Sequence, residues 1–173
     1  MGGYVALDFQ RRYPQRTAGL ILAATRAGAD SEEGKAGRDK AADLARAEGV
    51  GAIADSMLPK LLAASHYQSQ PDLVEFMRDM MLATSEEGVI GALAAMRDRP
   101  DSTSLLGSID FPTLIIHGQD DQLIPPSEAQ VMRQAIPGSQ LVLVPEAGHL
   151  PNLEQPQIFN DAVREFLLQF YNS

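Results

Sequence analysis

The feature that most constrains the fold is a strand–helix–strand pattern that lies between Phe111 and Pro156. Two short runs rich in Ile, Val and Leu, Thr113–His117 and Gln140–Val144, are each bounded by turn residues. Between them, Ser127–Ile136 has apolar residues at helical spacing. A crossover helix between two continuous apolar strands is typical of a buried sheet in which the two strands run parallel. The pattern therefore predicts an α/β fold.

A reactive side chain follows each of these two strands. Asp121 comes shortly after the first strand and His149 shortly after the second. Ligands of open parallel sheets bind outside the carboxyl ends of the strands, so we expect the two side chains to meet there. An aspartate that orients a histidine is the acid–base part of a nucleophilic relay. Asp120 leaves two readings open, because either aspartate can be the functional residue while the other belongs to a solvated turn.

The rest of the chain predicts a third strand and a long helical insertion. Thr17–Thr25 is a continuous apolar run typical of a buried strand, and residues 4–13 before it have helical spacing. About four helical patterns follow, one of them beginning at a Thr84–Glu87 capping box. We predict a core of residues 1–25 and 100–173, with three mostly parallel strands and flanking helices, and a helical cap of residues 26–99. Its methionines suit either an ordinary helical core or an adaptable apolar pocket.

Other titratable residues have plainer interpretations. His117 ends an apolar strand, which favours a buried structural histidine over a catalytic one. His66 lies in the insertion, at the surface or lining a pocket. Three arginines of the insertion suit either a substrate carboxylate or a solvated helix face: Arg26, Arg38 and Arg46. With three histidines and no carboxylate cluster beside them, the sequence predicts no metal site.

Composition excludes several classes of partner. The 173 residues suit one domain with a substantial core, and the formal net charge of −9 argues against binding nucleic acid or an anionic membrane. No apolar run reaches membrane-spanning length. The chain has no cysteine and no basic leader, so we expect a cytoplasmic protein.

Three segments of the chain resemble the α/β-hydrolase family. They are Met1–Leu7, Pro112–Asp121 with Pro125 and Pro126, and Pro145–His149 with Asn152–Pro156. In that family the nucleophile elbow reads Gly-x-Ser-x-Gly-Gly and the triad follows in the order Ser, Asp, His. The resemblance implies that Asp121 is the acid, His149 the base and the Met1 nitrogen an oxyanion-hole donor. It also implies a Ser-His-Asp hydrolase of small-molecule carboxylic esters or lactones that uses no cofactor. Carboxylesterases, 3-oxoadipate enol-lactonases and cofactor-free perhydrolases are the subfamilies of similar sequence.

The family's nucleophile has no counterpart in this sequence. No Gly-x-Ser-x-Gly occurs, and Met1-Gly2-Gly3 resembles the residues that directly follow the serine. We therefore expect a partial α/β-hydrolase fold, from a gene fragment or from a start site placed at an internal methionine. The alternative function is a catalytically silent module that binds or dimerises through the unpaired edge of the Thr17–Thr25 strand.

Overall fold

The computed structural model describes the backbone of residues 1–171 and the side chains of residues 1–169. A single three-stranded parallel sheet in the order β1-β2-β3 organises these residues. Its strands are β1 (Leu20–Ala23), β2 (Thr113–Gly118) and β3 (Gln140–Val144). Leu20 pairs with Thr113, and Leu114 pairs with Gln140. The predicted α/β fold class and the parallel arrangement of the strands are confirmed.

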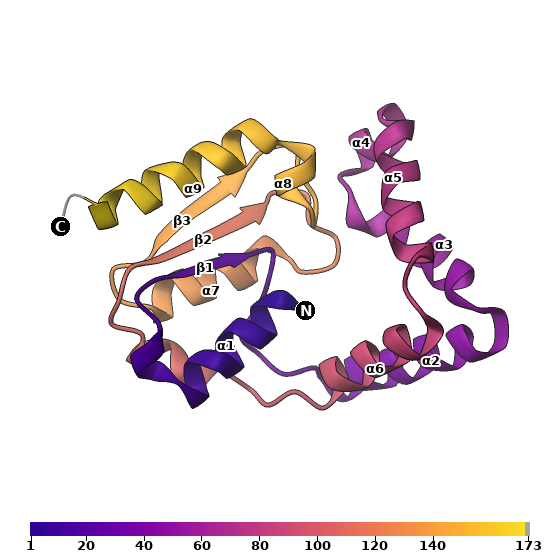
Figure 1. Ribbon diagram of the computed structural model, residues 1–173, viewed down its shortest axis with the longest axis horizontal. Helices are drawn as coiled ribbons and strands as arrows, with labels where there is room; N and C mark the ends of the chain where they lie inside the picture. The colour runs from indigo at the N-terminus through magenta and orange to yellow at the C-terminus, as the bar shows by residue number, and fades with distance from the viewer. Residues whose placement is uncertain (172–173) are drawn as a thin grey trace.

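Helices cover both faces of this sheet (Figure 1). α9 (Pro156–Tyr171) lies on one face, whereas α1 (Gly2–Arg12) and α7 (Pro126–Ala135) lie on the other. All residues of β2 are buried, as expected for a central parallel strand that is covered on both sides. Shorter helical segments complete the sheet-bearing part: η1 (Pro14–Arg16), η2 (Thr103–Ser108) and α8 (Pro151–Glu154).

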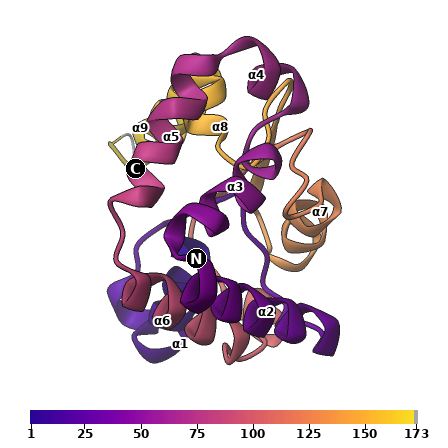
Figure 2. The same cartoon turned by 90° about the vertical axis from the view of Figure 1, so that its right-hand side faces the viewer.

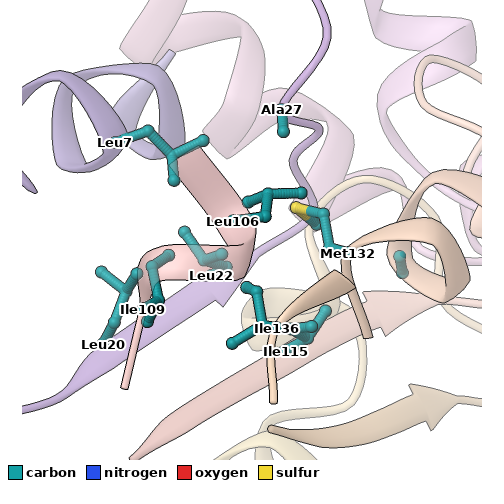
Figure 3. Packing of buried hydrophobic residues seen from close by; sticks show 10 residues of the cluster. Leu7, Leu20, Leu22, Ala27, Leu106, Ile109, Ile115, Met132 and Ile136 are labelled. Carbon is teal, nitrogen blue, oxygen red and sulfur yellow. The ribbon is translucent and has the colours of Figure 1, made fainter. Parts of the chain in front are cut away.

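Two apolar clusters hold the sheet between its helices. Successive residues of a strand point to opposite faces, so Leu114 and Ile116 pack with Phe166 of α9, while Ile115 packs on the other side. The cluster on that other side is shown in Figure 3 and includes Leu7, Leu20, Leu22, Leu106, Ile109, Ile115, Met132 and Ile136. The position of each strand end, and of the loops that follow, is fixed by this packing.

A helical insertion separates β1 from β2. It contains five helices rather than the four that periodicity predicts: α2 (Glu32–Glu48), α3 (Val50–Leu61), α4 (Ala64–Ser69), α5 (Pro71–Leu82) and α6 (Glu86–Arg97). They lie on the side toward which the strand arrows point (Figure 1). Figure 2 views the molecule from this side, with α2 beside α6 and α3 beside α5. No helix among the described residues is both long and apolar enough to span a membrane.

Two local expectations were wrong. The predicted strand Thr17–Thr25 is longer than the observed β1, which begins only at Leu20 and ends at Ala23, because Ala24 has a φ of 45° and the chain turns there. The Thr84–Glu87 capping box is displaced by one residue: the Ser85 side chain caps α6 by accepting from the Gly88 N–H.

A buried ion cluster ties both ends of the insertion together. The Asp30 side chain is 1% exposed and accepts hydrogen bonds from Arg26, from Arg38 at 3.0 Å and from Arg99 at 2.9 Å. Arg99 also donates to the Gly28 carbonyl and stacks 4.0 Å from the Tyr4 ring centroid. Burial alone raises the pKa of Asp30, but hydrogen bonds from Arg99 and Arg38 outweigh it and lower this pKa to about 2.

Folding stability should therefore depend on the ionisation of Asp30. A carboxyl whose pKa is depressed in the folded state stabilises it above the unfolded pKa and loses that contribution as pH falls through the folded value. From pH 5 to pH 2, we expect Asp30 to withdraw about 2 kcal/mol from the free energy of unfolding. Urea titrations at both pH values measure the total loss, which should be smaller by about 2 kcal/mol in Asp30→Asn than in the unaltered chain. Asp43→Asn, at an exposed ion pair with Arg46, should retain it; equal pH dependence of all three proteins would contradict the assignment.

Candidate active site

Asp121 and His149 meet at the carboxyl end of the sheet. Asp121 lies in the loop after β2 and His149 in the loop after β3, and the Asp121 Oδ2 is 2.8 Å from the His149 Nδ1. The Asp121 side chain is fully buried, whereas that of His149 is 20% exposed. Because a carboxylate only accepts, the Nδ1 of His149 must carry the proton in this bond. The Nε2 of His149 has no hydrogen-bond partner among the described residues.

The other oxygen of Asp121 is held by its own loop. The Oδ1 accepts from the backbone N–H of Leu123 at 2.9 Å and of Ile124 at 3.0 Å. Burial alone raises the pKa of Asp121, but hydrogen bonds from His117, His149 and the Ile124 N–H outweigh it. The pKa of Asp121 is therefore held well below its ordinary value, and the group is an anion at neutral pH. Asp120, by contrast, is exposed, so only Asp121 has the geometry of an orienting acid.

His117 contacts the same carboxylate, a contact that the sequence did not predict. Its ring is fully buried, as expected, and its Nε2 lies 2.8 Å from the Ile124 carbonyl and 3.3 Å from Asp121 Oδ2. An N–H shared between these two acceptors fixes both the loop and the carboxylate. The other ring nitrogen of His117, Nδ1, has no hydrogen-bond partner among the described atoms.

The two loops can approach because glycine occupies their closest points. A Cβ at Gly118 would lie 2.0 Å from the Gly148 carbonyl oxygen, a distance that no side chain tolerates. The Asp120 N–H donates to the Ala147 carbonyl at 2.9 Å and so links the loops directly. Close backbone approach of this kind requires glycine and sets the separation of Asp121 from His149.

Met1, the third site residue of the sequence analysis, is not brought into hydrogen-bonding contact with the pair. It caps α1, and its carbonyl accepts from the Tyr4 N–H at 2.9 Å. Burial, together with the charges of Arg38 and Arg99, lowers the pKa of its amine. The glycines that follow allow close packing, since a Cβ at Gly3 would lie 2.2 Å from the Thr25 Oγ1.

The remaining candidates have structural partners. Arg26 and Arg38 are only partly exposed and bind the buried Asp30, which corrects the reading of these two as a solvated helix face. Arg46 is exposed, as that reading expects, and binds Asp43 at 2.7 Å. His66 is mostly buried, with its Nδ1 3.2 Å from Glu154. Within the described residues, no three His, Asp or Glu side chains cluster as metal ligands do.

The arrangement can perform general base chemistry. A histidine whose Nδ1–H is held by a buried carboxylate presents the lone pair of Nε2 outward and gains stabilisation when that nitrogen takes up a proton. The partly exposed ring of His149 lies at the strand ends, where ligands of parallel sheets bind.

The comparison with known proteins agrees with this fold. The family described as the alpha/beta hydrolase fold matches residues 1–156. The chain belongs to this family.

Its relatives include esterases and lactonases. A thermophilic esterase from Thermogutta terrifontis, solved with malate bound, is 46% identical with a TM-score of 0.93, over 97% of this chain and 62% of its own. The enol-lactonase from Burkholderia xenovorans LB400 is 30% identical with a TM-score of 0.87, over 97% and 63%. The 3-oxoadipate enol-lactonase 2 of Acinetobacter baylyi is 28% identical over 98% of this chain and 62% of its length. The chain thus spans somewhat less than two thirds of these relatives.

Proposed function

We propose that the intact protein hydrolyses carboxylic esters or lactones with His149 as its base and Asp121 as the acid that orients it. The observation that carries this proposal is the 2.8 Å bond between His149 Nδ1 and Asp121 Oδ2. It leaves the Nε2 of a partly exposed ring with no hydrogen-bond partner among the described residues. The esterase and the enol-lactonases to which the chain is similar support the substrate class.

In the proposed mechanism, a serine directly before Met1 in the intact protein is the nucleophile. The His149 Nε2 takes the serine proton as the serine oxygen attacks the carbonyl carbon, and Asp121 stabilises the imidazolium that forms. The imidazolium then protonates the leaving alkoxide, which gives an acyl-enzyme and a neutral ring. Water, deprotonated by Nε2, then attacks the acyl-enzyme, and the imidazolium returns the proton to the departing serine oxygen, which releases the acid and restores the serine.

The start of α1 suits the oxyanion in this scheme. In a longer chain, the nitrogen of Met1 is a peptide N–H at the beginning of an eleven-residue helix, where backbone donors stabilise negative charge. Gly3 lets this helix start pack directly on Thr25, two residues after the end of β1. The helices of residues 26–99, placed beyond the strand ends, are proposed to cap the substrate pocket.

The experiment that tests the proposal is covalent labelling of the intact protein with a fluorophosphonate probe. The probe reacts with an activated serine, so we expect mass spectrometry to find the label on the residue before Met1. Inactivation by the probe should parallel the loss of p-nitrophenyl acetate hydrolysis. Hydrolysis that persists in fully labelled protein, or a label on any serine of residues 2–173, would contradict the proposed nucleophile.

A second candidate function rests on the edge of the sheet. Among the described residues, β1 pairs with β2 alone, so its other edge presents backbone groups to a further strand. A catalytically silent chain that dimerises through this edge would give no probe label and would elute as a dimer. A labelled, monomeric intact protein excludes this second candidate.

A further inference from the structure

Glu154 is a buried carboxylate that the proposed chemistry does not use. It ends the short helix α8, and its side chain is completely buried. Its Oε2 accepts from the Ala63 N–H at 2.7 Å, and its Oε1 accepts from the Gly148 N–H at 2.8 Å. The Nδ1 of His66 lies 3.2 Å from Oε2. Burial of a carboxylate is costly unless each oxygen is hydrogen-bonded, and here both are.

These bonds join two segments that are far apart in sequence. Gly148 directly precedes His149, while Ala63 lies at the corner between α3 and α4 of the insertion. The Oε1 of Glu154 also lies 3.4 Å from the N–H of Leu150, on the other side of His149. One carboxylate therefore holds the backbone before and after His149 and links it to the α3–α4 corner.

Two further contacts fasten His149 to the same corner. Its own N–H donates to the Leu61 carbonyl at 2.9 Å. A Cβ at Gly148 would lie 2.6 Å from the Ala63 nitrogen, so only glycine permits this approach. With the backbone bonded on both sides, the ring of His149 has little freedom except rotation about its side-chain bonds.

Apolar packing reinforces the junction. Leu58, Leu61 and Met77 of α3 and α5 form a buried cluster. Leu123, from the Asp121 loop, and Leu150, beside His149, pack against that cluster. Both loops of the candidate site are therefore seated on the insertion, and Glu154 lies at the polar centre of the junction.

We propose that Glu154 is a positioning residue, which locks the His149 loop to the α3–α4 corner and so sets the orientation of the His149 ring toward Asp121. The proposal concerns the Asp121–His149 pair and extends the proposed function. His149 is then a competent base only while the helical insertion stays docked against the loop that carries it. A side chain that holds a catalytic group in place acts through geometry, where a shift of about 1 Å costs roughly 10²-fold in rate.

Glu154→Gln tests this role with little change of shape. The amide keeps one acceptor oxygen, but its NH₂ group must face either the Gly148 or the Ala63 N–H, so two donors oppose each other. The first readout is the proton NMR signal of the His149 Nδ1–H in the 173-residue chain, which is strongly deshielded while it is bonded to Asp121. We expect this signal to be lost or to move upfield in Glu154→Gln and to persist in Glu165→Gln, which makes the same charge change on the exposed side of α9.

The second readout is kinetic and uses the intact protein. Misorientation of the base lowers kcat by about 10- to 100-fold and leaves KM within about threefold, because substrate binding is not affected. An unchanged Nδ1–H signal together with unchanged kcat would overturn the proposal. The NMR signal does not require turnover, so an intact protein without esterase activity would refute the proposed function and leave the role of Glu154 standing.

Hydrogen exchange of the unaltered chain covers the case in which Glu154→Gln fails to fold. The N–H groups of Ala63 and Gly148 have Glu154 as their acceptor, so both should be protected to a similar degree as the N–H groups of β3. Rapid exchange of these two N–H groups in a protein whose strands are protected would overturn the proposal.

Discussion

Replacing His149 with alanine is expected to lower the kcat of the intact protein toward p-nitrophenyl acetate by on the order of 10⁴-fold. The proposed mechanism uses the Nε2 of His149 in every proton transfer: to take the nucleophile's proton, to protonate the leaving group, to take a proton from water and to return it to the serine. The other imidazole that contacts Asp121, that of His117, cannot replace it, because His117 is fully buried and already donates its Nε2–H to the Ile124 carbonyl. Steady-state kinetics near neutral pH measure the loss.

The matched control for this variant is Asn152→Ala. Asn152 lies three residues after His149, in α8, and its side chain is exposed. Truncation there should leave kcat within about twofold, because the exposed side chain takes no part in the proposed proton transfers. Its loss should also change stability by less than about 0.5 kcal/mol. A His149→Ala protein that retains more than a tenth of the parent rate would show that another group is the base.

The strand-end position of both residues could be predicted because it follows from chain geometry. A buried strand, a crossover helix and a second buried strand bring both carboxyl ends to one edge of the sheet. The structure has β2 and β3 within one residue of the predicted runs and places Asp121 beside His149. The catalytic roles of the two residues stay a prediction, whereas their proximity is a property of the fold.

The contacts of His117 and Glu154 depend on how loops fold back, which periodicity does not describe. His117 reaches Asp121 because the residues after β2 turn sharply enough for Ile124 to accept from the same ring nitrogen. Glu154 stands in a segment that resembles the α/β-hydrolase family, but its role depends on backbone N–H groups that are 91 and 6 residues away in the sequence. Backbone donors leave no signal in a sequence, so a buried acceptor of this kind is found only from the structure.

The arginines illustrate a similar limit. The sequence around Arg26 and Arg38 fits a solvated helix face or a ligand contact, because nothing in it marks Asp30 as a buried carboxylate. Asp30 lies just before a helix, where an aspartate is common and attracts no notice. The carboxylate is buried among three guanidinium groups only because the two ends of the insertion pack together. The third of these groups belongs to Arg99, which follows α6.

The second large effect is expected for Asp121→Asn, which should lower kcat by on the order of 10⁴-fold with little change in KM. The Asn oxygen can keep the bonds from the Leu123 and Ile124 N–H groups that Asp121 Oδ1 now accepts. Its NH₂ group must then take the place of Oδ2 and face the His149 Nδ1. A donor in that place stabilises the tautomer of His149 whose proton is on Nε2, and this tautomer cannot accept the nucleophile's proton.

Asp120→Asn is the control, because it removes the same charge one residue earlier, from an exposed side chain. If field effects of a lost negative charge governed the rate, the two variants would be impaired alike. If the tautomer of His149 governs it, Asp120→Asn keeps a kcat within about twofold of the parent, and Asp121→Asn loses the His149 Nδ1–H NMR signal together with activity. An Asp121→Asn protein that keeps a tenth or more of the parent kcat would remove Asp121 from the mechanism and leave it as a buried support of its loop.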